Sequence, residues 1–337
     1  MEIVNVGIIG VGPWGKNHVR VYNEIEEANL KAICDLNKEN LKIAQSHKIH
    51  ATTNYKEILN NSEINALSIC VPASLHYQIT KEALEAGKHV LIEKPFVMNS
   101  EQGQELIDIA KEKNLILAVG HIFRFDPAVN YIKEEIKKGT FGRIYYISLS
   151  RLGLKTPRKE IGAIFNYAVH DLDIMCYILN QEFPEEITAV TSYPLKRKFE
   201  DHAIISARFK ETIGYAQVGW LTPRKLREFW LVGEKKSASI DPMNFEVELF
   251  NSGIIPEYKS WGEFRLITKE GPSSKPSIEK KEPLKEELRH FIHCIINKKI
   301  DIIDGSVGLR TIKMVEAALK SANEKRTIRL DNNGNAI

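Results

Sequence analysis

Cysteines, surplus charge and long apolar runs are all scarce in this chain of 337 residues. No run of about eighteen apolar residues occurs, so we expect no transmembrane helix, and the N-terminus lacks the basic and apolar regions of a signal peptide. Basic residues exceed acidic ones by only three, 47 against 44. This balance gives no reason to expect a nucleic acid or a membrane as a partner.

The four cysteines are far apart in the sequence and include no CxxC pair. This spacing argues against a disulfide framework and against a thiolate metal site. We expect buried, inert thiols and a cytoplasmic protein, because a reducing compartment fits this usage. The residues concerned are Cys34, Cys70, Cys176 and Cys294.

The first 120 residues alternate short apolar runs with helical patterns. The runs are nearly continuous, as in strands that are buried on both faces of a parallel sheet. Strands are expected at 3–9, 30–34, 66–71, 89–92 and 115–119, and helices at 16–25, 38–47, 55–60, 77–86 and 100–113. We expect Ser100 to cap the last of these helices, and Gly87 and Asn114 to end two of them. The pattern predicts a doubly wound Rossmann domain over residues 1–120.

Residues 121–337 are expected to form a second α/β domain. Helical patterns at 128–138 and 167–179 flank a strand at 144–150, and a series of strands follows at 186–192, 203–209, 214–219, 225–232, 237–240 and 247–250. So many strands with few helices between them predict an open, mostly antiparallel sheet. A surface loop is expected at 271–277, and helices close the chain at 284–297 and 306–323.

A glycine-rich segment joins the first expected strand to the first expected helix. Its sequence has the spacing G-x-G-x-x-G, and in this context the glycines permit a tight turn and a close approach of a pyrophosphate to the backbone. The alternative is a glycine-rich turn that binds nothing. We expect the cofactor to contact Gly10, Gly12, Pro13, Trp14 and Gly15.

Asp35 follows the second expected strand, where a carboxylate can accept hydrogen bonds from both ribose hydroxyls. A carboxylate there would repel a 2′-phosphate, which favours NAD over NADP. Asn37 and Lys38 follow closely, so NADP stays open as the alternative.

A buried strand ends in Glu93-Lys94-Pro95. Ligands bind at the carboxyl ends of strands in such sheets, and a lysine there can polarise a substrate oxygen and pass a proton. A plain surface lysine is the alternative. Glu93 and Lys94 are therefore also expected at the cofactor, as are Pro72 and His76, which follow the strand expected at 66–71.

The glycine-rich turn, the Glu-Lys-Pro turn and a later His-x-x-Asp together resemble the Gfo/Idh/MocA oxidoreductases, over nearly the whole chain. The resemblance implies a Rossmann domain and an α/β domain with an open antiparallel sheet. It also implies oxidation or reduction of sugars and polyols with NAD or NADP, and association into a homodimer or homotetramer through the open sheets.

The resemblance further implies that Lys94 and His170 are catalytic. The family places an aspartate four residues before this histidine, but here that position is Asn166. An amide cannot act as a general acid or base at neutral pH, so we interpret Asn166 as a hydrogen-bonding partner of the substrate. Asn166, His170 and Asp173 would share one face of a helix, and Asp173 is also expected to bind substrate. The sugar is expected between the two domains.

A narrower resemblance, to the UDP-N-acetylglucosamine 3-dehydrogenase group, rests on residues 120–129, 151–153, 157–158 and 168–171. It implies oxidation of the C3 hydroxyl of a nucleotide sugar to a ketone. Arg124, Arg151 and Arg158 are then candidates to pair with a diphosphate. Two alternatives stay open: another sugar or polyol dehydrogenase or reductase, similar to inositol dehydrogenases, and a non-catalytic regulator that senses NAD.

His290, His293 and Cys294 lie at helical spacing and could in principle bind a metal. Their segment is amphipathic, so we interpret them as part of a packed helix and expect no metal site.

Overall fold

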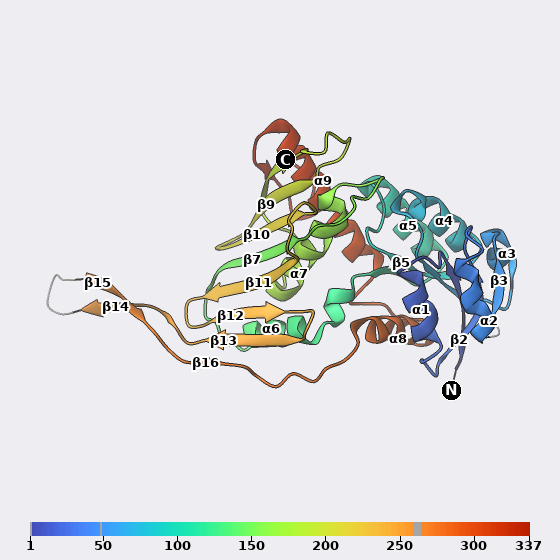
Figure 1. The fold of residues 1–337 in the computed structure, drawn as a ribbon, viewed down its shortest axis with the longest axis horizontal. Coiled ribbons are helices and arrows are strands. Elements are labelled where there is room, and N and C mark those ends of the chain that lie inside the picture. Colours follow the sequence, from blue (N-terminus) through green and yellow to red (C-terminus); the bar gives the residue numbers. More distant parts are fainter. Residues whose placement is uncertain (1, 48, 259–263) are drawn as a thin grey trace. The chain divides into compact units, whose positions relative to one another are not determined.

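The computed structural model describes residues 2–47, 49–258 and 264–337, which divide into two compact units (Figure 1). The first unit contains Met1–Phe125 and Lys281–Glu316, and the second contains Asp126–Lys280 and Ala317–Ile337. The segment Lys281–Glu316 therefore joins the N-terminal unit, which differs from the boundary expected after residue 120.

The first unit is built on a six-stranded parallel sheet in the order β3-β2-β1-β4-β5-β6. This confirms the predicted doubly wound α/β domain. The prediction of five strands missed β3, because that strand has only three residues and two of them are exposed. The strands are β1 Val4–Ile9, β2 Ala28–Cys34, β3 His50–Thr52, β4 Ala66–Ile69, β5 His89–Glu93 and β6 Leu117–Gly120.

Helices connect these strands, and the helix ends follow capping chemistry. The side chain of Asn99 accepts a hydrogen bond from the Gln102 amide at 2.9 Å, so Asn99 caps α5, and the prediction of Ser100 was wrong by one residue. Gly87 and Asn114 have positive φ values of 75° and 55° and end two helices as predicted. The helices are α1 Gly15–Tyr22, α2 Ile43–His47, α3 Tyr55–Asn60, α4 His76–Glu85, α5 Ser100–Glu112, α8 Pro283–Ile296 and α9 Gly305–Glu324.

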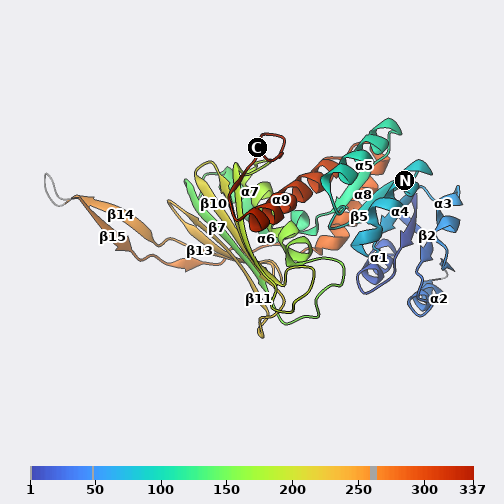
Figure 2. The same cartoon turned by 90° about the horizontal axis from the view of Figure 1, so that it is seen from above.

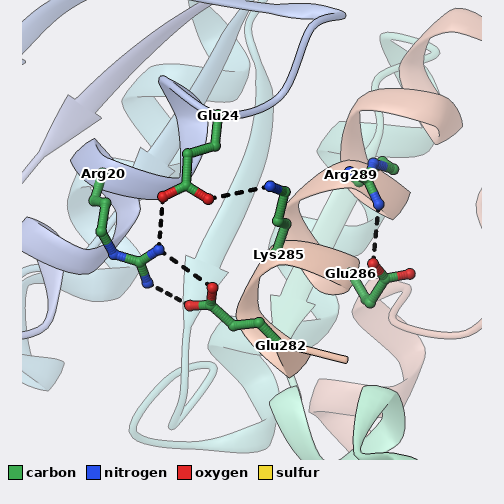
Figure 3. A network of polar contacts seen from close by, with 6 residues as sticks. All are labelled: Arg20, Glu24, Glu282, Lys285, Glu286 and Arg289. Atoms are coloured by element: carbon green, nitrogen blue, oxygen red, sulfur yellow. Dashed lines mark hydrogen bonds and ion pairs between the residues drawn. The ribbon is translucent and has the colours of Figure 1, made fainter. Parts of the chain in front are cut away.

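Helix α8 returns to the first unit because its apolar face completes that unit's core. Leu288, Phe291 and Ile292 are buried in the same cluster as Val6 of β1 and Val19 of α1. At the rim, Arg20 of α1 pairs with Glu282, and Lys285 of α8 donates to Glu24 of α1 at 3.1 Å (Figure 3). Exposed pairs of this kind contribute about 0–1 kcal/mol each, so apolar burial holds the helix in place.

The second unit contains a nine-stranded sheet in the order β16-β13-β12-β11-β7-β10-β9-β8-β17. Only β7 and β10 pair in parallel, and the other neighbours pair antiparallel, as predicted. Helices α6 (Pro127–Lys137) and α7 (Val169–Leu179) lie on one side of it (Figure 2). The strands are β7 Ile144–Leu152, β8 Glu186–Ser192, β9 His202–Phe209, β10 Thr212–Gly219, β11 Leu226–Gly233, β12 Ser237–Asp241, β13 Glu246–Phe250, β16 Ser273–Ser274 and β17 Ile328–Arg329.

A hairpin of β14 (Gly253–Tyr258) and β15 (Phe264–Lys269) projects away from this sheet (Figures 1 and 2). The sequence analysis did not predict it. The short β16 lies inside the segment predicted as a loop at 271–277 and pairs with β13.

No helix in the described part of the chain is long and apolar enough to cross a membrane. All four cysteines carry free thiols, and three of them are buried. Burial raises the pKa of Cys34 and of Cys294 to about 11, which keeps both thiols protonated and unreactive at neutral pH.

Candidate active site

The glycine-rich turn after β1 has the shape that a pyrophosphate needs. Gly10 has a φ of +92°, and a Cβ there would lie 2.6 Å from the Cys70 carbonyl oxygen. A Cβ on Gly15 would lie 2.0 Å from the Gly10 oxygen, so a tight contact of helix and turn requires that glycine. A Cβ on Gly12 would meet no atom within 4 Å. The open space at Gly12, beside the N-terminus of α1, fits the phosphates of a dinucleotide.

Asp35 lies directly beside this turn. Its Oδ2 accepts a hydrogen bond from the Val11 amide at 2.7 Å, and its Oδ1 accepts one from the Asn37 amide at 2.8 Å. Each carboxylate oxygen retains a lone pair that can accept a hydroxyl. Asp35, which was predicted to bind the ribose hydroxyls, therefore also stabilises the glycine-rich turn by a hydrogen bond.

Glu93 and Lys94 lie at the end of β5. Glu93 is 8 % exposed, and its Oε1 accepts a hydrogen bond from Trp14 Nε1 at 2.6 Å and lies 3.1 Å from His18 Nε2. Burial disfavours the charged form of Glu93, but the contacts with His18 and Trp14 and the charge of Lys94 outweigh it and lower the pKa of Glu93. The Glu93 carboxylate thus contacts other side chains of the first unit, while Lys94 is partly exposed.

His76, which was predicted at the cofactor, is buried under the Glu-Lys-Pro turn. Its Nδ1 lies 2.7 Å from the Pro95 carbonyl oxygen, and its Nε2 lies 3.0 Å from that of Val71. Burial lowers the pKa of His76. His76 therefore lies between the turn and the end of β4, where its neutral ring can donate to one of the two oxygens. The neighbouring Pro72 is exposed.

In the second unit, Asn166 and His170 lie on consecutive helical segments. A π-helical turn at Ile164–Ala168 precedes α7, where the sequence predicted one regular helix from 167 to 179. Such turns are frequent at functional sites. Asn166 and His170 are partly exposed, whereas Asp173 is 1 % exposed. The exposure of the first two suits contact with a ligand.

Two arginines of the second unit lie near one buried carboxylate. The Arg151 Nε donates to Asp171, which is completely buried. The guanidinium of Arg227 lies 5.4 Å from the centre of the Tyr167 ring, and its pKa is lowered by burial and by the positive charge of Arg151. The result is a surplus of positive charge beside Tyr167. The sequence analysis missed Arg227, because only the pairing of β11 with β7 places it opposite Arg151.

The other predicted arginines have different surroundings. Arg124 belongs to the first unit, is 6 % exposed and donates to the Ile302 carbonyl oxygen at 2.8 Å. Arg158 is exposed in the second unit, and its carbonyl oxygen accepts a hydrogen bond from Arg197 at 2.7 Å. Of the three candidates, Arg151 is the one that lies opposite a second arginine on a neighbouring strand.

Residues 4–121 match the model of an oxidoreductase family with an NAD-binding Rossmann fold, and residues 133–330 match the model of that family's C-terminal α/β domain. The chain belongs to the Gfo/Idh/MocA oxidoreductase family. It is therefore an oxidoreductase, and the resemblance inferred from the motifs is confirmed.

Relatives within the family include UDP-N-acetylglucosamine 3-dehydrogenase of Acidithiobacillus ferrooxidans, which is 27% identical over 92% of this chain and 94% of the relative. A solved structure of that enzyme has a TM-score of 0.80, with 25% identity over 96% of this chain and 99% of the other. Myo-inositol 2-dehydrogenase of Thermotoga maritima is 24% identical over 97% of this chain and 99% of the relative. A levoglucosan dehydrogenase in complex with NADH has the same fold, with a TM-score of 0.81 at 20% identity and coverage of 97% and 99%.

Three possible metal ligands come together at the end of α8. His290 Nε2 lies 3.1 Å from Asp301 Oδ1 and 3.4 Å from Cys294 Sγ. The ring of Phe125 packs on His290 at 5.4 Å. The three polar groups thus already contact one another inside a packed helix end, which is the role that the sequence analysis gave to His290 and Cys294.

The glycine geometry predicts different results for two substitutions in the turn. Gly12→Ala should leave the melting temperature nearly unchanged, because its methyl group enters open space, but should weaken NAD binding about tenfold or more, or about 1.4 kcal/mol. Gly15→Ala should destabilise the fold itself, because its methyl group overlaps a backbone oxygen. Thermal unfolding together with titration of NADH fluorescence checks both. Equal NAD affinity in Gly12→Ala and the wild type would contradict this placement of the phosphates.

Proposed function

We propose that the protein is an NAD-dependent dehydrogenase that oxidises the C3 hydroxyl of a nucleotide sugar, such as UDP-N-acetylglucosamine, to a ketone. The observation that carries the substrate class is the cross-strand pair of Arg151 and Arg227, of which Arg151 donates to the buried Asp171. The similarity to a UDP-N-acetylglucosamine 3-dehydrogenase over most of both chains supports the same choice.

The two guanidiniums are suited to a diphosphate. Asp171 neutralises at most one of them, so an anion that approaches this side of the sheet gains charge-assisted hydrogen bonds. The guanidinium of Arg227 is partly removed from water, which strengthens its interaction with an anion. A neutral polyol offers no charge to match this surplus.

Lys94 and His170 carry the proton chemistry in this proposal. NAD, when bound, supplies the hydride acceptor. His170, as the neutral imidazole, removes the proton from the hydroxyl that is oxidised. The Lys94 ammonium stabilises the developing alkoxide by a charge-assisted hydrogen bond. Asn166 holds a neighbouring hydroxyl of the sugar, because its amide cannot exchange a proton at neutral pH.

Two other functions lead to different outcomes. A polyol dehydrogenase, similar to the inositol enzymes, would use the same two catalytic residues without a diphosphate. A non-catalytic NAD sensor would bind the cofactor and turn over no sugar. Retention of both a lysine at position 94 and a histidine at position 170 favours an enzyme over a sensor.

The outer face of the second unit's sheet is proposed to form the contact in a homodimer or homotetramer. Every second residue on β8, β9, β10 and β11 points to this face, and five of them are large, apolar and exposed by 36–68 %: Val190, Ile204, Ile213, Tyr215 and Trp230. Apolar area of this extent on one flat face commonly marks an interface.

Substitution of Arg227 tests the substrate class. Arg227→Met keeps the length of the side chain and removes its charge, so KM for UDP-N-acetylglucosamine should rise about tenfold or more, since a charged hydrogen bond contributes about 1.5–3 kcal/mol. The activity with free N-acetylglucosamine should not change. Arg326→Met is the control, because Arg326 is an exposed arginine of the same unit that lies outside the strands of the sheet. A wild type that oxidises myo-inositol in preference to every nucleotide sugar would reject the substrate.

Substitution of Lys94 or His170 tests the catalytic assignment. Lys94→Ala and His170→Ala should each lower kcat about 10²–10⁴-fold, the usual contribution of a general acid or base, while the NAD dissociation constant changes little. His50→Ala is a control, because the His50 side chain is 63% exposed at the edge of the first unit's sheet. Either variant with wild-type turnover would remove that residue from the mechanism.

The cofactor preference follows from Asp35. NAD should bind more tightly than NADP, because the carboxylate repels a 2′-phosphate and accepts hydrogen bonds from a 2′-hydroxyl. Asp35→Ser should narrow the difference. Dissociation constants of both cofactors at one ionic strength provide the measurement, and NADP that binds as tightly as NAD to the wild type would refute the assignment.

The sheet-face interface can be tested by sedimentation. The wild type should be a dimer or tetramer at micromolar concentration, and Tyr215→Glu combined with Trp230→Glu should shift it towards the monomer, because each change buries a charge in the contact. A wild-type monomer at micromolar concentration would overturn the interface.

A further inference from the structure

A chain of buried hydrogen bonds joins the glycine-rich turn to the turn of Lys94. Trp14 lies inside the glycine-rich segment, and its Nε1 donates to Glu93 Oε1 at 2.6 Å. The other oxygen, Oε2, accepts a hydrogen bond from the backbone amide of Lys94 at 3.3 Å. The Glu93 carboxylate therefore contacts both the glycine-rich turn, where the cofactor phosphates are proposed to bind, and the backbone amide of the proposed catalytic lysine.

The chain continues into the core of the first unit. His18 Nε2 lies 3.1 Å from Glu93 Oε1, His18 Nδ1 lies 3.3 Å from Ser68 Oγ, and Ser68 Oγ lies 2.8 Å from the Tyr22 hydroxyl. His18, Ser68 and Tyr22 are completely buried. Space for the carboxylate comes from Gly120, where a Cβ would lie 3.0 Å from Glu93 Oε1.

A single assignment of protons satisfies every one of these contacts. In this assignment the Tyr22 hydroxyl donates to Ser68, Ser68 donates to His18 Nδ1, and His18 donates from Nε2 to Glu93. Trp14 can only donate, and it also donates to Glu93. All donors therefore point towards one carboxylate, which stabilises Glu93 as an anion, and linked hydrogen bonds of this kind strengthen one another.

Burial keeps three other acidic groups near Glu93 in their neutral forms. Glu287 of α8 is completely buried, and neither of its carboxyl oxygens has a hydrogen-bond partner among the described residues. Burial and the charge of Glu93 raise the pKa of Glu287 well above its usual value, and the same causes raise the pKa of the Cys70 thiol. Burial also raises the pKa of Tyr22. Glu93 is thus the anion of the cluster, and the charge of Lys94 is among the causes that lower its pKa.

We propose that Glu93 is a positioning residue that fixes the Lys94 turn against the glycine-rich turn through Trp14 and His18, and that its charge keeps the Lys94 ammonium protonated. This role of Glu93 rests on the proposed function in one respect only, which is that Lys94 is catalytic. It adds two residues, His18 and Trp14, that act on catalysis through Glu93 without touching the substrate.

The test is to measure the ionisation of Lys94 directly. In the full-length protein with NAD bound, lysines methylated with isotope-labelled formaldehyde give NMR signals, and the Lys94 signal is the one absent from Lys94→Arg. Glu93→Gln should lower the titration midpoint of Lys94 by about one pH unit or more, because it removes the adjacent negative charge. With a sugar substrate, kcat should fall about tenfold while the NAD dissociation constant stays within about threefold.

Glu287→Gln is the matched control, since it makes the same chemical change in the same cluster on a carboxyl that is already neutral. The Lys94 titration should not move in Glu287→Gln. Trp14→Phe removes one donor and keeps the ring, so it should shift the titration in the same direction by a smaller amount, and it serves as the test if Glu93→Gln does not fold.

Three outcomes would overturn the proposal. In the first, Glu93→Gln binds NAD and Lys94 titrates as in the wild type. In the second, Glu93→Gln fails to fold and Trp14→Phe leaves the Lys94 titration in place. In the third, Glu287→Gln shifts the titration as much as Glu93→Gln does. The NMR titration needs no sugar, so a wild type without activity on nucleotide sugars would refute the proposed function while this test still decides the role of Glu93.

Discussion

The buried carboxylate of Glu93 is the interaction on which the geometry of the first unit's site depends. A buried anion is costly unless donors surround it, and here Trp14, His18 and the Lys94 amide provide them. Those donors come from the glycine-rich turn, from α1 and from the end of β5. Satisfying one charge therefore joins the glycine-rich turn and the adjoining α1 to the end of β5, which is far from them in the sequence.

The topology of the sheet explains why these elements meet. Strands β1, β4 and β5 are neighbours and run in parallel, so the glycine-rich turn, Val71 and the Glu-Lys-Pro turn all follow their carboxyl ends. His76 links the carbonyl oxygens of Val71 and Pro95 beneath them. Helix α8 closes the core behind α1 and brings Glu287 close enough to Glu93 for the charge of Glu93 to raise the pKa of Glu287. Hydrogen bonds between the turns and apolar burial of α8 beneath them thus stabilise the edge of the sheet where the cofactor is proposed to bind.

Local signals in the sequence were sufficient for most of the fold. The glycine spacing, the continuous apolar runs and the period-two strands are properties of neighbouring residues, and they predicted both sheets. Strand β3 and the π-helical turn at Ile164–Ala168 were not predicted, because no periodic pattern of apolar residues identifies them. The position of α8 in the first unit, the Arg151–Arg227 pair and the donors around Glu93 depend on contacts across many residues, which a single sequence does not display.

The account treats the two units as having different tasks: the first binds the cofactor and holds Lys94, and the second provides His170 and the positive charge for a diphosphate. Its central claim is that hydride leaves C3 of a nucleotide sugar. The most direct measurement uses UDP-N-acetylglucosamine with deuterium at C3, followed by mass spectrometry of the reduced cofactor. The account predicts that the deuterium is found at C4 of the nicotinamide and that turnover is slower than with the unlabelled sugar. Reduced cofactor without deuterium, formed at the unlabelled rate, would show that another carbon is oxidised and would contradict it.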